Sequence, residues 1–156
     1  FYAGLRACEI AALRVGDVFD EASNVKDTIY LNSAQTKGSD STTVLVNTKL
    51  KRQLEKFAKQ YPVHMSTRTA PLLFSAKGGG FSAQTIVNLF KRIYKIAGIE
   101  GASSHSGRRQ FVTKLADQGI NARLVQVLAR HKHLSTTQRY IDVNENALRN
   151  AVEVLK

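Results

Sequence analysis

Cysteine and tryptophan are almost absent from this sequence. It has one cysteine, Cys8, and no tryptophan in 156 residues. A single cysteine cannot form an internal disulfide, which fits a reducing compartment. Cys8 lies in an apolar helical run, so a small core residue is favoured over a reactive thiol.

The sequence also lacks the features of membrane proteins and of nucleotide-dependent or two-metal enzymes. No run approaches the roughly 18 apolar residues of a membrane span, and no signal peptide is visible. The glycine-rich segment Lys77-Gly78-Gly79-Gly80 does not end in the Lys-Ser/Thr pair of a phosphate-binding loop, and no carboxylate cluster suits two-metal nuclease chemistry. We therefore expect no metal, no cofactor and no membrane partner. Any phosphate chemistry must rely on Arg, Lys and His.

Acidic residues are outnumbered by basic ones. There are 23 Lys and Arg residues against 12 Asp and Glu, a net charge of +11. This excess favours a polyanionic partner, of which a nucleic-acid backbone is the commonest. A ribosome-like protein, a binder of membrane surfaces and a basic protein with no nucleic-acid role remain alternatives. The hydrophobic fraction of 43% and the length fit one globular domain with a real core.

The periodicity of apolar residues predicts an α+β fold, mostly helical with a small antiparallel β-sheet. Two β-branched runs, Lys26–Ser33 and Thr42–Val46, flank a turn-rich segment with Lys37 near the tip of the expected hairpin. Pro62–Pro71 is predicted to be a loop. Helices are predicted over 4–14 with Gly16 as the stop, from the cap Asn47 to about 61, after Ser82 to 97, and over 105–118. Further helices are predicted over 122–130 after the capping residue Asn121, in a short stretch after Ser135, and from Asn146 to the end.

The first candidate motif is Gly4-Leu5-Arg6-Ala7-Cys8-Glu9. Arg6 interrupts an apolar helical run, so its charge must either reach water or be held by a partner. One interpretation is an ion pair with Glu9, three residues on. In the other interpretation Glu9 orients its neighbours and Arg6 faces a phosphate.

The second candidate motif is His105-Ser106-Gly107-Arg108-Arg109. On a helix, His105 and Arg108 would share one face. Arg108 can direct two donors to a pair of phosphate oxygens, and His105 can bind a third oxygen or move a proton. The alternative is a basic helix end with Arg108 and Arg109 in solvent.

The third candidate motif runs from His131 to Tyr140. A His131–His133 metal site is disfavoured, because no cysteine or acidic residue completes the ligand set. Tyr140 is either a half-buried tyrosine at a helix end or a nucleophile. A phenol has a pKa near 10, so nearby cations would be needed to stabilise its phenolate.

Taken in order, these motifs resemble the tyrosine recombinase (phage integrase) family over nearly the whole chain. Gly-Leu-Arg-x-x-Glu is similar to the family's first arginine motif, and His105-x-x-Arg108 to its His-x-x-Arg motif. His131 lies nine residues before Tyr140, the family's spacing from second histidine to nucleophile. The sequence differs from the family at three positions: Arg130 stands where glycine is usual, Gly107 where leucine is frequent, and Arg109 where histidine is frequent.

The resemblance implies site-specific recombination or integration by DNA cleavage and rejoining, without metal or ATP. Tyr140 would attack the scissile phosphodiester, forming a 3′-phosphotyrosyl bond and releasing a 5′-hydroxyl. The resemblance also assigns phosphate binding to Arg6 and Arg108, protonation of the leaving oxygen to Lys37, and a supporting role to Glu9. His105 would assist proton transfer at the tyrosine, and His131 would bind the phosphate.

The resemblance also implies double-stranded DNA as partner and a tetramer formed on DNA by exchange of the C-terminal helix, residues 146–156. Alternatively, this helix folds back on its own domain. Because the chain starts at Phe1, we expect 1–156 to be a single catalytic domain truncated at its N-terminus, without the family's N-terminal DNA-clamping domain. A bacterial or phage-encoded, cytoplasmic, nucleoid-associated protein is expected. A non-catalytic DNA-binding relative and a type IB topoisomerase-like relaxation enzyme are the alternatives.

Overall fold

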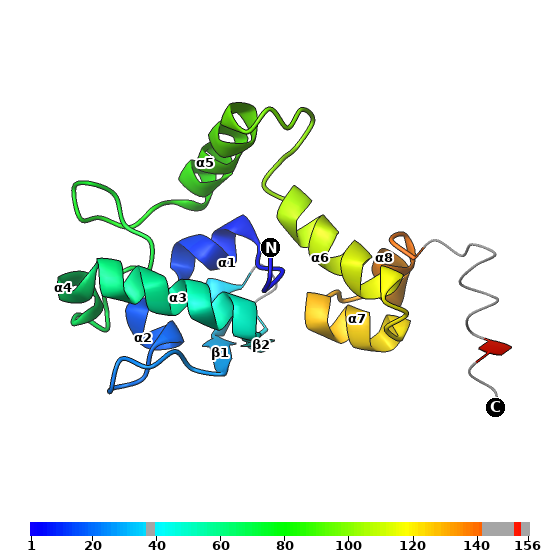
Figure 1. The fold of residues 1–156 in the computed structure, drawn as a ribbon, viewed down its shortest axis with the longest axis horizontal. Coiled ribbons are helices and arrows are strands. Elements are labelled where there is room, and N and C mark those ends of the chain that lie inside the picture. The colour runs from blue at the N-terminus through cyan, green and yellow to red at the C-terminus, as the bar shows by residue number, and fades with distance from the viewer. Residues whose placement is uncertain (37–39, 142–151, 154–156) are drawn as a thin grey trace. The chain divides into compact units, whose positions relative to one another are not determined.

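The computed structural model of the chain describes residues 1–36, 40–141 and 152–153. It divides into two compact units, residues 1–108 and residues 109–156, which are taken separately below. Helices predominate and the two strands form one antiparallel sheet, so the predicted fold class is confirmed (Figure 1).

The first unit combines a strand hairpin with helices. The hairpin consists of β1, Thr28–Leu31, and β2, Thr42–Leu45, with the 3₁₀ helix η1, Ser33–Gln35, in the connection. The helices are α1 (Ala7–Ala12), α2 (Val15–Val18), α3 (Thr48–Gln60), α4 (Pro62–Met65) and α5 (Ala83–Ile96). Of these, α5 packs against α1.

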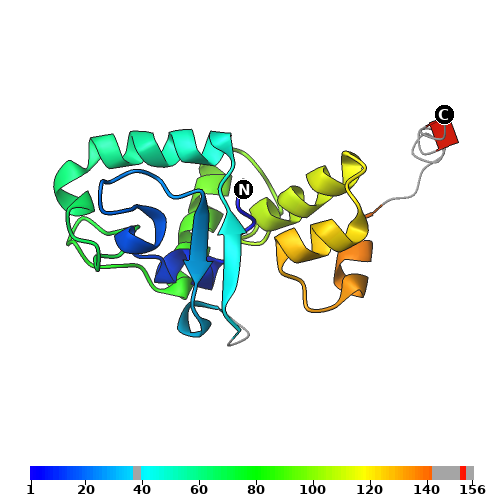
Figure 2. The same cartoon turned by 90° about the horizontal axis from the view of Figure 1, so that it is seen from below.

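The hairpin buries one face of its strands. Ile29 and Val44 are register partners, and β1 alternates between exposed and buried residues. Ile29 and Leu31 are buried, whereas Tyr30 between them is exposed. This period of two is the expected pattern of a half-buried antiparallel strand, and Figure 2 shows the two strands side by side.

Helix α3 covers the same core and begins where the sequence predicts. The Asn47 side chain accepts a hydrogen bond from the Leu50 N–H at 2.9 Å, which caps the helix. The apolar side of α3 packs against a core formed by hairpin and helix residues, among them Leu13, Val15, Val18, Phe19, Ile29, Leu31 and Val44.

Three predictions for the first unit are wrong. The predicted helix 4–14 is shortened to α1, because Leu13 is extended and its carbonyl accepts a hydrogen bond from the Leu72 N–H at 2.8 Å. Gly16 lies inside α2 instead of ending a helix. The predicted loop after Tyr61 contains α4, which has Pro62 in its first turn, where the missing N–H costs no hydrogen bond.

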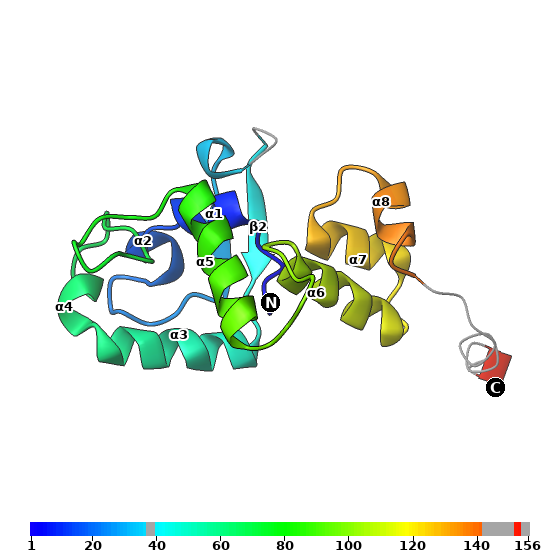
Figure 3. The same cartoon turned by 90° about the horizontal axis from the view of Figure 1, so that it is seen from above.

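The second unit holds most of α6 (Ser106–Asp117), which begins in the first unit, and all of α7 (Ala122–Ala129) and α8 (Leu134–Gln138) (Figure 3). Asn121 caps α7, as predicted, by accepting from the Arg123 N–H at 2.8 Å. The core of this unit is small, with Val112, Val125 and Ala129 buried and Tyr140 packed against them.

The predicted C-terminal helix, residues 146–156, lies outside the described residues except for Val152 and Glu153, which are helical and exposed. In the three described stretches of chain, no helix has the length and apolar character that crossing a membrane requires.

Two adjacent glycines in the turn before α5 allow a test of the backbone conformation of that turn. Gly78 has a φ of +81°, Gly79 lies outside the left-handed region, and a Cβ at either position would meet nothing within 4 Å. We expect Gly78→Ala to lower the free energy of unfolding by about 1 kcal/mol, because a side chain disfavours the left-handed region. Gly79→Ala should change it by less than about 0.5 kcal/mol. Urea denaturation checks this, and equal effects would contradict the assigned turn.

Candidate active site

Arg6 is held at the start of α1 by Glu9. Its Nη1 lies 2.7 Å from Glu9 Oε1, and its backbone N–H donates to Glu9 Oε2 at 2.8 Å. The Glu9 side chain is completely buried, while that of Arg6 keeps 26% of its surface exposed. The predicted ion pair therefore exists, and it fixes a guanidinium that still reaches solvent.

Arg108 is buried instead of lying in solvent. Only 8% of the residue is exposed, and its Nη1 donates to the Gly4 carbonyl at 2.5 Å. Gly4 has a φ of +55°, a conformation that favours glycine over residues with a side chain. The alternative of a solvated helix end is therefore wrong for Arg108, although Arg109 is exposed.

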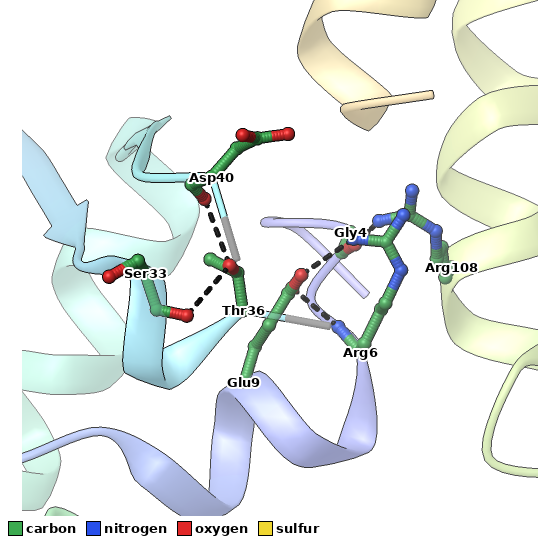
Figure 4. Close-up of polar contacts among 7 residues, drawn as sticks. All are labelled: Gly4, Arg6, Glu9, Ser33, Thr36, Asp40 and Arg108. Carbon is green, nitrogen blue, oxygen red and sulfur yellow. Dashed lines mark hydrogen bonds and ion pairs between the residues drawn. The ribbon is translucent and has the colours of Figure 1, made fainter. Parts of the chain in front are cut away.

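The first unit brings the two arginines together. Arg108 donates to the carbonyl of Gly4, two residues before Arg6, and Figure 4 shows the guanidinium groups of both arginines at the Gly4–Arg6 segment. Glu9 supplies one negative charge against two positive ones. Two forks of N–H donors with a net positive charge form a good site for the oxygens of a phosphate.

The base of the hairpin connection is also fixed close to α1. Thr36 Oγ1 donates a hydrogen bond to the Asp40 carbonyl at 2.9 Å or to the Ser33 carbonyl at 3.3 Å, as Figure 4 shows. The Gln35 side chain donates to the Ala12 carbonyl of α1 at 3.0 Å. Lys37 itself lies outside the described residues, so its role stays a prediction.

His105 lies before α6 instead of on it. The helix begins at Ser106, and His105 is exposed, its backbone N–H donating to Ser103 Oγ at 3.3 Å. His105 therefore directly precedes the helix that carries Arg108, and the predicted shared face stays a prediction. His105 is placed by the turn that enters the helix.

The second unit brings His131 and Tyr140 together. Their ring centroids are 6.3 Å apart with 26° between the ring planes. Nδ1 of His131 lies 2.9 Å from Oγ1 of Thr137. Tyr140 is half-buried against the small core of this unit, whereas His133, which has no predicted role, precedes α8 and is exposed.

The end of α7 shapes the backbone of His131. Arg130 adopts the left-handed conformation (φ 56°, ψ 45°), and the His131 N–H then donates to the Gln126 carbonyl at 3.0 Å. The Gln126 side chain donates to the His131 carbonyl at 3.0 Å. A glycine at position 130 would adopt this conformation without the cost of about 1–2 kcal/mol that arginine incurs.

Sequence reasoning missed three contributors to these clusters: the Gly4 carbonyl, Gln126 and Thr137. Gly4 carried a signal, because glycine directly before a motif indicates a special backbone conformation. Gln126 carried none, since polar residues on short helices are usually exposed. Thr137 lies in the segment Thr137-Gln138-Arg139-Tyr140, which resembles the family's usual lead-in to the tyrosine, but its burial was not predicted. Gln126 and Thr137 are both buried.

No metal site is apparent in the parts of the chain that the structure describes. Within residues 1–36, 40–141 and 152–153, no three His, Cys, Asp or Glu side chains lie close enough to hold an ion together. The clusters described above also contain one carboxylate, that of Glu9, and one side-chain amide, that of Gln126, beside their arginine, histidine and hydroxyl groups.

Comparison with known proteins identifies the family. A model of the phage integrase family matches residues 1–147. The chain belongs to the phage integrase family. The tyrosine recombinase XerA of Pyrococcus horikoshii is 31% identical over 160 residues, which cover 99% of this chain and 51% of XerA. XerD of Rickettsia conorii is 26% identical, covering 97% of this chain and 52% of its own.

Solved structures agree on the fold of this integrase-family chain. A crystal structure of XerA recombinase has a TM-score of 0.76 and 26% identity, and covers 99% of this chain and 54% of its own. A structure of XerH recombinase bound to difH substrate has a TM-score of 0.69 and 21% identity. The match covers 99% of this chain and 44% of the XerH chain. The chain thus spans about half the length of the relatives it matches.

Two ion pairs, the buried Glu9–Arg6 pair and the exposed Asp27–Lys51 pair, allow a matched test of how much the Glu9 contact stabilises the fold. Their N–O distances are similar, 2.7 and 2.8 Å, but Asp27 is 85% exposed. We expect Glu9→Gln to lower the free energy of unfolding by about 1–3 kcal/mol, because it weakens a buried, charge-assisted contact. Asp27→Asn should leave the midpoint of urea unfolding unchanged. If Glu9→Gln and Asp27→Asn lowered the free energy of unfolding equally, Glu9 would not be the support inferred for Arg6.

Proposed function

We propose that this chain carries the catalytic centre of a tyrosine recombinase, an enzyme that cleaves and rejoins DNA strands during site-specific recombination or integration. The observation that carries the proposal is the pairing of the Arg6 and Arg108 guanidinium groups, each held by its own partner. Such a pair suits an anion with several equivalent oxygens. Membership of the phage integrase family supports a phosphodiester as that anion.

The proposed reaction is a transfer of the phosphoryl group from one oxygen to another. Tyr140 Oη attacks the scissile phosphorus, a 3′-phosphotyrosyl bond forms, and the bond from phosphorus to the 5′ oxygen breaks. Lys37 donates a proton to the leaving oxygen, so a free 5′-hydroxyl is released. Rejoining reverses these steps, and the bond energy stays in the ester, so ATP is not required.

The other residues stabilise charge or move protons in this proposal. Arg6 and Arg108 bind the non-bridging oxygens, on which negative charge grows in the transition state. Glu9 orients Arg6. His131 donates a hydrogen bond to the phosphate, and His105 assists removal of the tyrosine proton.

Double-stranded DNA is the proposed partner. The net charge of +11 favours a polyanion. The similar structures include XerH bound to difH substrate and the Tn1549 transposon integrase in complex with circular intermediate DNA; the latter has a TM-score of 0.70, 18% identity, and coverage of 99% of this chain and 56% of its own. Self-association as a tetramer on DNA through residues 146–156, and association with the nucleoid, extend the proposal.

The nucleophile can be tested with two tyrosine variants. Tyr140→Phe removes only the attacking oxygen, so covalent protein–DNA adducts should fall more than about 100-fold, while DNA binding stays within about twofold. Tyr30→Phe, at an exposed tyrosine of β1, should leave adduct formation unchanged. Adducts are measured with the protein containing this chain, on a library of nicked duplexes, by gel shift after denaturation.

Adducts that survive Tyr140→Phe would remove Tyr140 as the nucleophile. Binding with a steep salt dependence and no adduct from the unmodified protein would instead favour the non-catalytic DNA-binding alternative. Relaxation of supercoiled DNA by a monomer at no defined site would favour the topoisomerase-like alternative.

A further inference from the structure

Thr137 is a polar side chain buried deep in the second unit. It lies in α8 with no exposed surface, and its Oγ1 is 2.9 Å from Nδ1 of His131. The preceding residue, Thr136, is only partly buried. Two adjacent threonines on one short helix therefore have different surroundings.

The hydroxyl proton of Thr137 needs an acceptor. A hydroxyl with no exposed surface does not contact bulk water, buried polar groups are usually hydrogen-bonded, and the hydroxyl carries one proton. Among residues 1–36, 40–141 and 152–153, Nδ1 of His131 is the one hydrogen-bond partner found for Thr137 Oγ1. If the proton of the His131–Thr137 bond came from Nδ1, the proton of the Thr137 hydroxyl would be buried without an acceptor.

We infer that Thr137 is a positioning residue that donates its hydroxyl proton to Nδ1 of His131 and thereby keeps the proton of the neutral imidazole on Nε2. Any further hydrogen bond of the ring must then use Nε2, and it must be a donor bond. The catalytic meaning of this tautomer rests on the function proposed above. There, His131 must donate to a phosphoryl oxygen, and an unprotonated Nε2 would face that oxygen with a lone pair.

The backbone of His131 is held as firmly as its ring. Gln126, which is buried, accepts from the His131 N–H with its carbonyl and donates to the His131 carbonyl with its side chain, both at 3.0 Å. Arg123 Nη1 in turn donates to Gln126 Oε1 at 2.8 Å. Because main chain and ring are both fixed, the donor is oriented before any ligand arrives, the arrangement that most stabilises a transition state.

The tautomer can be read directly by nitrogen NMR of the imidazole rings. We would record two-bond ¹H–¹⁵N correlations of the ¹⁵N-labelled chain at a pH where His131 is neutral. The unmodified chain should show a protonated Nε2 and an unprotonated Nδ1 whose resonance is shifted by its hydrogen bond. In Thr137→Val, which keeps the shape and removes the hydroxyl, the Nδ1 resonance should move towards that of an unbonded imine nitrogen.

Two further variants serve as controls. Thr137→Ser retains a hydroxyl and should restore the Nδ1 resonance, which a purely steric role would not produce. Thr136→Val makes the same change one residue away and should leave His131 unaffected. A matching melting temperature for the three variants excludes unfolding as the cause of any difference.

The inference is overturned if His131 carries its proton on Nδ1, or if Thr137→Val leaves the Nδ1 resonance where it was. These readouts need no DNA, so they succeed or fail independently of the proposed recombinase function. With DNA, Thr137→Val should reduce the rate of adduct formation about 10- to 100-fold, the size of effect seen when a partner that orients a metal-bound histidine is removed. If the NMR result is as expected but neither the unmodified protein nor any variant forms adducts, the proposed function is wrong and the inference about Thr137 stands.

Discussion

The buried carboxylate of Glu9 is the constraint on which the first half of the candidate site depends. Its two oxygens bind the backbone N–H and the guanidinium of Arg6, so one side chain both caps α1 and fixes the arginine. Burying a carboxylate costs several kcal/mol unless charge-assisted hydrogen bonds compensate. Arg6 provides that compensation and is thereby held in one orientation.

Arg108 depends on the same short segment of chain. Its acceptor is the carbonyl of Gly4, two residues before Arg6, so the turn at Gly4 links the two guanidinium groups. Placing two positive charges side by side costs free energy when no anion is bound. In the proposed function this cost is met during folding, so the phosphate would bind without rearranging either side chain.

The second unit uses hydrogen bonds between neutral groups for a similar purpose. Gln126 and Thr137 hold the main chain and the ring of His131, and neither adds charge. A neutral imidazole with a fixed proton can donate to an oxygen without the desolvation cost of a buried cation. In the proposed function, the first unit would contribute the positive charge of the arginines, and the second unit would contribute His131 as a hydrogen-bond donor and Tyr140 as the nucleophile.

The sequence predicted most of the local structure, although the short helix α4 was predicted to be a loop. β-Branched runs predicted the hairpin, and Asn47, Ser82 and Asn121 mark the helix starts that the structure shows. These signals need only neighbouring residues.

Contacts between distant residues could not be predicted. The predicted helix 4–14 ends early because Leu13 and Val15 bond the backbone near residue 70. Arg108 is buried because its acceptor lies 104 residues earlier in the chain. No periodicity encodes such pairings, so the motifs predicted which residues matter but not what holds them.

The most direct test of the account is a titration of the chain with inorganic phosphate, followed through the ¹⁵Nε resonances of its arginines. If Arg6 and Arg108 form one anion site, their resonances will shift together with a single dissociation constant. Arg14, whose Nη1 binds the Thr69 carbonyl elsewhere in the first unit, will not follow them. Shifts of Arg6 and Arg108 with different dissociation constants, or no shift of either, would contradict the account.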